Sequence, residues 1–87
     1  MGNYKVLIKR SAAKELETLP AKDRGRVAAR IQQLGSDPRP SGCEKLSGDD
    51  RFRIRQGNYR IIYSVEDKVL TVMVVKVGHR RDIYRRR

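Results

Sequence analysis

The stretch from residue 51 to residue 60 constrains the fold most, because it has the pattern of a β-hairpin. It reads Arg-Phe-Arg-Ile-Arg-Gln-Gly-Asn-Tyr-Arg. Successive side chains of a strand point to opposite faces, so three arginines share one face and two apolar side chains the other: Arg51, Arg53 and Arg55 against Phe52 and Ile54. Gly57-Asn58 is typical of a two-residue hairpin turn. The sequence therefore predicts two antiparallel strands with different faces.

The turn also sets the register of the hairpin. It pairs residues 56 with 59, 55 with 60, 54 with 61, and 52 with 63. Arg55 then lies opposite Arg60, and two cations about 6 Å apart repel by roughly 1–3 kcal/mol. A fold that keeps such a pair is expected to use it to hold an anion. The alternative is a solvated strand face, and Arg51 by itself fits a surface position better than a site.

The charge of the chain points to an acidic partner. Lys and Arg number 21 against 10 Asp and Glu, which gives a formal net charge of +11. Guanidinium groups bind phosphate in a bidentate manner and stack on bases, so the excess favours a nucleic acid or an acidic protein. The 87 residues predict one domain spanning residues 1–87, with a small core.

Several classes of protein are not expected. No stretch is long and apolar enough to span a membrane, and the N-terminus does not read as a signal peptide. The single cysteine, Cys43, cannot form an internal disulfide and lacks neighbours at metal-ligand spacing. We therefore expect a cytoplasmic protein without a metal site.

The remaining pattern predicts an α+β fold. An N-terminal strand (4–9) precedes two antiparallel helices (11–19 and 21–34), with Ser11 as the first N-cap and Gly35 after the second helix. Residues 35–50 read as a loop in which 43–46 could pair briefly with a strand. A three-strand antiparallel meander follows, over residues 51–56, 59–66 and 69–77, with both helices on one face of the sheet.

The second turn decides which face the end of the chain presents. If Asp67-Lys68 is also a two-residue turn, Val75, Val77 and His79 lie on the arginine face. A slip of one residue would reverse this assignment.

At this point the sequence resembles a known family. The resemblance covers almost the whole chain and is carried by runs at residues 4–20, 37–40, 45–48, 52–63 and 77–84. The strongest are Phe-Arg-Ile-Arg-Gln-Gly-Asn-Tyr-Arg-Ile-Ile-Tyr and Val-Gly-His-Arg-Arg-Asp-Ile-Tyr. They are similar to toxins of the RelE/ParE superfamily, and most like the RelE-type messenger-RNA interferases.

The resemblance implies an endoribonuclease that cuts mRNA on the ribosome. The RNA's own 2′-hydroxyl would attack the adjacent phosphate, leaving a 2′,3′-cyclic phosphate or 3′-phosphate and a 5′-hydroxyl. This chemistry requires charge stabilisation and proton transfer but neither metal nor cofactor. The implied partners are a RelB-like antitoxin, mRNA and rRNA.

The resemblance also implies roles for individual residues. Arg53 and Arg55 match two basic positions on a strand, and Arg60 matches an arginine that holds the phosphate. Arg80 matches an arginine at the leaving oxygen, and Tyr84 matches a tyrosine that stacks on a base, although packing with Ile83 against the helices is the alternative. Arg51 and Arg81 are expected to add substrate contacts.

The proton acceptor is an open question at this stage. The best-studied pattern has lysines at positions 53 and 55, whereas a guanidinium stays protonated above pH 12 and is a poor base. His79 is a hypothetical acid or base because its unperturbed pKa lies near neutrality, but a structural or orienting role is the alternative.

Two other functions compete with mRNA cleavage. One is a ParE-like inhibitor of DNA gyrase without nuclease activity, and the other is a basic binding module without toxicity. The joint presence of four arginines and an aromatic residue favours the nuclease: Arg53, Arg55, Arg60, Arg80 and Tyr84.

Overall fold

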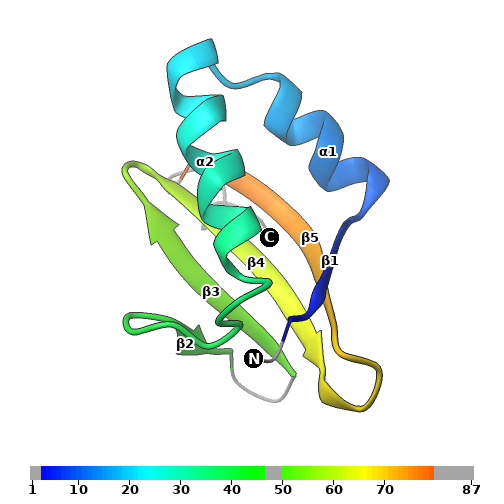
Figure 1. Cartoon of the computed structure of the whole chain (residues 1–87). Helices are drawn as coiled ribbons and strands as arrows, with labels where there is room; N and C mark the ends of the chain where they lie inside the picture. Colours follow the sequence, from blue (N-terminus) through cyan, green and yellow to red (C-terminus); the bar gives the residue numbers. More distant parts are fainter. Residues whose placement is uncertain (1–2, 47–49, 80–87) are drawn as a thin grey trace.

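One mixed β-sheet with two helices on one face makes up the fold (Figure 1). The computed structural model describes residues 3–46 and 50–79. The strands are β1 (Lys5–Ile8), β2 (Glu44–Lys45), β3 (Arg51–Gln56), β4 (Tyr59–Glu66) and β5 (Thr71–His79), in the spatial order β1-β5-β4-β3-β2. β1 runs parallel to β5, and the other neighbours are antiparallel. The predicted α+β class and the meander are confirmed.

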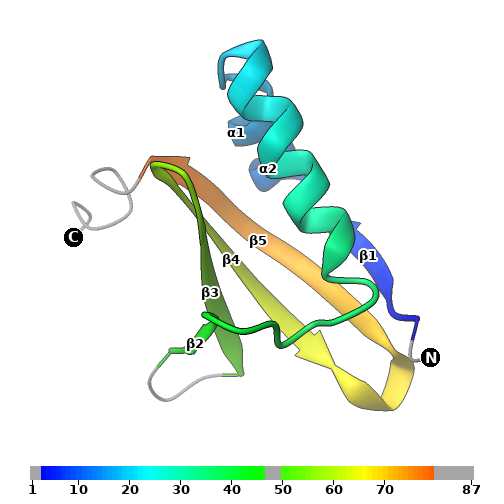
Figure 2. The same cartoon turned by 60° about the vertical axis from the view of Figure 1, so that its left-hand side comes forward.

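Helices α1 (Arg10–Glu17) and α2 (Ala21–Gln33) run in opposite directions across one face of the sheet (Figures 1 and 2). Val27, Ile31 and Leu34 recur at helical spacing and are fully or almost fully buried. In α1, the Glu15 carboxylate accepts hydrogen bonds from the Val77 backbone N–H at 2.9 Å and the Lys76 ammonium at 2.8 Å. This contact ties α1 to β5. No helix in the described ranges is long and apolar enough to cross a membrane.

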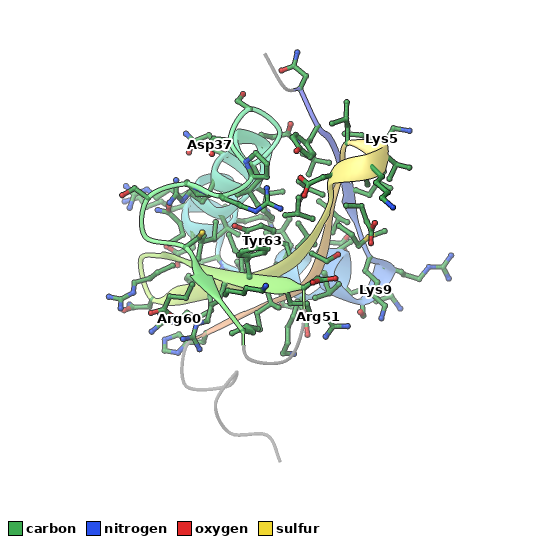
Figure 3. All side chains as sticks on the ribbon, turned by 90° about the horizontal axis from the view of Figure 1, so that it is seen from below. Lys5, Lys9, Asp37, Arg51, Arg60 and Tyr63 are labelled. Atoms are coloured by element: carbon green, nitrogen blue, oxygen red, sulfur yellow. The ribbon has the colours of Figure 1, made fainter. Side chains whose placement is uncertain are left out.

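The core lies between the helices and the sheet. The strands contribute their inward-facing side chains to it: Ile54, Ile61, Tyr63, Val65, Val72, Val74 and Val77. The opposite face of the sheet carries the arginines. Figure 3 shows Arg51 and Arg60 on the side of the sheet away from Tyr63 and Asp37.

The β3–β4 hairpin has the predicted register. Gln56 pairs with Tyr59, Arg55 with Arg60, and Ile54 with Ile61. Gly57 has φ of +61°, a conformation that type II′ turns require at their first central residue and that glycine adopts without strain. The sequence pattern therefore predicted this part of the sheet correctly.

The predicted register of β5 is wrong. The turn after β4 is a short 3₁₀ segment, Asp67–Val69, followed by Leu70 in the left-handed region, so β5 begins at Thr71 and both Val69 and Leu70 are exposed. The turn is two residues longer than predicted, and because side chains alternate with a period of two, this change alone leaves each side chain of β5 on its predicted face. A bulge then places Val75 between two register pairs, Tyr63 with Val74 and Ile62 with Lys76.

The bulge reverses the face of every later residue in β5. Val77 pairs with Ile61 and is buried in the core, and His79 pairs with Tyr59. Both therefore lie on the helix-covered face and not on the arginine face.

The start of the first helix differs from expectation, whereas the glycine after the second helix is confirmed. The first helix begins at Arg10 after Lys9, so Ser11 lies inside its first turn instead of capping it. Gly35 follows the second helix as predicted, and a Cβ at this position would lie 3.0 Å from the Tyr4 carbonyl oxygen. Glycine is needed there because the chain just before β1 lies against the backbone of residue 35. The backbone N–H of Tyr4 donates a 2.8 Å hydrogen bond to the Gly35 carbonyl oxygen.

Candidate functional site

Three arginines of the hairpin converge on one depression in the open face of the sheet. Arg53 and Arg55 come from β3 and Arg60 from β4, and together with Gly42, Glu44 and Ile54 they line a hollow of about 200 Å³. Arg60 is only 9% exposed although it is charged. A concave site with several guanidinium groups is suited to an anion, because each guanidinium presents a planar fork of N–H donors.

A carboxylate, Glu44, lies among these guanidinium groups. Glu44 of β2 pairs directly with Arg53 of β3, so the two side chains emerge on the same face. Arg53 donates from Nε to Glu44 Oε1 at 3.1 Å and forms a second bond from Nη2 to the same oxygen. Among the described residues that line the hollow, three carry a guanidinium group and one carries a carboxylate, so their summed charge is positive.

The arginines also change the acidity of Glu44. The hydrogen bonds and charge of Arg53 lower the pKa of the Glu44 carboxyl below its ordinary value, and the charges of Arg60 and Arg55 lower it further. Glu44 is therefore ionised at neutral pH.

The loop that leads to Glu44 is fixed at two points. The Tyr63 hydroxyl donates to the Pro38 carbonyl oxygen at 2.8 Å. Arg39 donates to both carboxylate oxygens of Asp67, at 3.2 and 2.9 Å, and its guanidinium lies 5.4 Å from the centre of the Phe52 ring. These contacts hold the segment before β2 against β3 and β4, which positions Glu44 beside the arginines.

His79 belongs to a different environment. It lies edge-on to Tyr59, with ring centroids 5.6 Å apart, and lines a separate hollow beside the end of α1. The Tyr59 hydroxyl donates to Asp23 of α2 at 3.1 Å. Because this cluster faces the helices, the described arrangement does not bring His79 to the arginine hollow.

The four remaining predicted site residues do not line the arginine hollow as it is described. Arg51 is exposed on the arginine face but does not line the hollow. Arg80, Arg81 and Tyr84 lie outside the described residues.

Sequence reasoning missed Glu44 as a site residue. The possible pairing of residues 43–46 was a usable signal, since a strand there would place one acidic side chain near the arginine strand. The register that aligns Glu44 with Arg53 depends on the intervening loop, which the local pattern does not specify.

Comparison with known proteins places these features in context. Residues 6–84 match the family described as the ParE toxin of the type II toxin–antitoxin system parDE. Toxin RelG of Mycobacterium tuberculosis is 33% identical over 91 aligned residues, which cover 95% of this chain and 98% of that toxin.

Solved structures share the fold over similar lengths. The toxin–antitoxin complex RelBE2 of Mycobacterium tuberculosis contains a chain with a TM-score of 0.80 and 26% identity, covering 88% of this chain and 98% of that one. The archaeal RelE–RelB complex of Pyrococcus horikoshii gives a TM-score of 0.77 and 31% identity, with coverage of 90% and 96%.

Proposed function

Because the chain belongs to the RelE/ParE superfamily of toxins from type II toxin–antitoxin systems, we propose that it is an endoribonuclease that cuts mRNA on the ribosome and halts translation. The observation that carries this proposal is the convergence of Arg53, Arg55 and Arg60 in one hollow. Three neighbouring cations repel one another, and binding of the scissile phosphate of RNA between them would offset that repulsion.

The proposed chemistry is transfer of the phosphate to the RNA's own 2′-hydroxyl. As the 2′-oxygen bonds to phosphorus, the phosphate gains negative charge, and preorganised cations stabilise that charge most where water is partly excluded. Arg60 is well suited to this role because it is nearly buried, and Arg55 lies directly across the hairpin from it. The proposal also assigns roles to four further residues. Arg80 acts at the leaving oxygen, Tyr84 stacks on a base, and Arg51 and Arg81 make additional contacts with the RNA.

The proposed partners follow from charge and family. The relatives of known structure include RelB–RelE complexes, so we propose a RelB-like antitoxin as the partner that neutralises this toxin. A formal charge of +11 also suits contact with rRNA around the decoding site. The proposed location is the cytoplasm, where ribosomes and mRNA are found.

The test is a cleavage assay on ribosomes programmed with a defined mRNA. We expect the purified protein to cut ribosome-bound mRNA, to leave free mRNA largely intact, and to produce 5′-hydroxyl ends. Arg55→Ala should lower the rate by about 100–1,000-fold, as loss of one oxyanion-stabilising donor does in other enzymes.

Arg26→Ala is the matched control, because it removes the same charge from an exposed position of α2. This variant should cut like the wild type. Equal losses in both variants would mean that general charge, and not the hollow, carries the activity.

A ParE-like gyrase inhibitor is the second candidate, and the family match described as ParE toxin favours it. Intact mRNA on programmed ribosomes together with blocked supercoiling by purified DNA gyrase would support this candidate and refute the nuclease. Absence of growth arrest on expression without an antitoxin would refute both.

A further inference from the structure

We propose that a second hollow, on the helix-covered face of the sheet, binds an unpaired base of the mRNA. It has a volume of about 320 Å³ and lies beside the end of α1 and the neighbouring ends of β4 and β5. Its lining includes Glu15, Leu19, Tyr59, Lys76 and His79, and we call it the helix-side hollow. The inference rests on the proposed function, which brings mRNA to the arginine hollow, and adds a base-binding subsite to it.

The first argument is the pair of aromatic rings in this hollow. The Tyr59 and His79 rings meet edge to face, with centroids 5.6 Å apart and planes at 81° to each other. In such a pair, one ring contributes its edge and keeps its own faces for other partners. Both side chains are half-buried, and Leu19 and Val77 line the hollow with them. Aromatic faces of this kind are the surfaces on which unpaired RNA bases stack.

The second argument is the charge of the described residues that line the hollow. Glu15 and Lys76 carry opposite charges and form an ion pair at 2.8 Å. Beyond this pair, only the His79 side chain can add a positive charge near neutral pH. The arginine hollow, with three guanidinium groups, therefore holds a phosphate or an acidic peptide better. An RNA base is planar and uncharged, which suits the helix-side hollow.

The third argument is the set of polar groups beside the rings. An ammonium has three N–H donors, and Lys76 directs one of them to Glu15, so it can also donate to a carbonyl oxygen or ring nitrogen of a base. The Thr18 hydroxyl donates to the Glu15 carbonyl oxygen at 2.7 Å, and its own oxygen can accept from an amino group. The Tyr59 hydroxyl donates to Asp23, which holds the ring in place. The hollow thus offers donors and acceptors to the edge of a base that stacks on a ring.

The fourth argument is the position of this hollow relative to the arginine hollow. Arg60, which lines the arginine hollow, pairs with Gly78, and the next pair along the strands is Tyr59 with His79. Consecutive side chains point to opposite faces, so Tyr59 and Arg60 lie back to back at one end of the sheet. Figure 2 shows the β3–β4 turn and the end of β5 side by side at this end, where Gly57 and Gly78 have no side chain. An RNA strand that crosses this end can place a phosphate at Arg60 and a nearby base at Tyr59.

The first experiment locates the base by cross-linking on programmed ribosomes. The mRNA has 2′-deoxyribose at the scissile position, so it lacks the attacking hydroxyl and stays intact. A set of such mRNAs carries a single 5-iodouridine at successive positions around the scissile phosphate, and ultraviolet light joins this base to an adjacent aromatic side chain. We expect one position to yield a peptide joined at Tyr59 or His79, identified by mass spectrometry.

The second experiment measures affinity for the same ribosome complexes in a double-mutant cycle. An abasic nucleotide at the cross-linked position should weaken binding of the wild type by about 5–150-fold, the effect of losing one base stacked on an aromatic ring. Tyr59→Leu keeps apolar volume but removes the ring, and it should weaken binding of the unmodified mRNA by a similar factor. On the abasic mRNA, Tyr59→Leu should bind as well as the wild type, because no base remains to stack.

Tyr4→Leu is the matched control. Tyr4 is also a half-buried tyrosine, but its hydroxyl donates to Asp67 at the opposite end of the sheet. The abasic nucleotide should therefore cost Tyr4→Leu as much affinity as it costs the wild type. His79→Ala repeats the cycle at the end of β5, so the test does not depend on the folding of Tyr59→Leu.

Other outcomes would overturn the proposal. Losses that add in full, for both Tyr59→Leu and His79→Ala, would mean that these residues act on the fold and not on the base. Cross-links that miss both rings at every position would have the same consequence, and absence of binding to programmed ribosomes would also overturn the nuclease function. Natural mRNA left intact, together with the expected cross-link and cycle, would refute the nuclease alone and support the base subsite.

Discussion

The hydrogen bond from Tyr63 to Pro38 is the contact whose removal tests the packing argument most directly. Tyr63 has no exposed surface, and its hydroxyl donates to the Pro38 carbonyl at 2.8 Å. Burial raises the pKa of this phenol, so the hydroxyl remains a donor throughout the physiological range. Tyr63→Phe keeps the ring in the core and removes only the donor.

The expected cost follows from the burial of both partners. A net hydrogen bond contributes about 0.5–1.5 kcal/mol, and a buried carbonyl left without a donor raises the cost to about 1–3 kcal/mol. For a chain of this size, each kcal/mol corresponds to about 4–8 °C in Tm. The same change at Tyr4 removes an exposed hydrogen bond to Asp67, which water replaces, so Tyr4→Phe should cost less than about 0.5 kcal/mol.

Urea unfolding of the purified proteins, followed by circular dichroism, would measure the free energy of unfolding of both variants against the wild type. Tyr63→Phe should lower the midpoint without changing the slope against urea. A cost for Tyr63→Phe no larger than that for Tyr4→Phe would refute the claim that this buried bond anchors the loop.

Two further predictions concern the turn and the exposed ion pair. Gly57→Ala should lower the free energy of unfolding by about 1–2 kcal/mol because φ at residue 57 is +61°. Gly25→Ala lies in an exposed and open position of α2 and should raise the free energy of unfolding by about 0.5–1 kcal/mol. Effects of the same sign in the two variants would contradict this reasoning. Hydrogen bonds from Arg39 and then from Tyr4 lower the pKa of Asp67 below 3.8, so its contribution to stability is complete above that value and is lost as the pH falls through the lowered pKa. The Tm advantage of the wild type over Asp67→Asn should therefore be constant above about pH 5 and shrink as the pH falls below about 4, and an advantage that is unchanged in acid would contradict the assignment.

The predictions that held were those that depended on local pattern. The strict alternation of residues 51–56 and the glycine turn define the β3–β4 hairpin, because strand period and turn length fix register over short distances. The apolar stripe of α2, with Val27, Ile31 and Leu34, likewise follows from helical spacing. These elements place three of the proposed site arginines together.

The predictions that failed concerned residues whose position depends on longer connections. One extra residue at Val75 reversed the face of His79, and no local signal distinguishes a bulged strand from a regular one in an apolar run. Val69 and Leu70, which lie in an exposed turn, were assigned to a strand because they begin an almost unbroken apolar run that continues to Val75.

The sequence by itself determined the arginine face, because the alternation of side chains is a property of the strand alone. Only the tertiary structure decided what shares that face. The loop held by Tyr63 and Arg39 brings Glu44 opposite Arg53, and the bulge removes His79 to the other side. Both outcomes depend on how distant segments pack, which is why the arginine hollow contains a carboxylate and not the histidine.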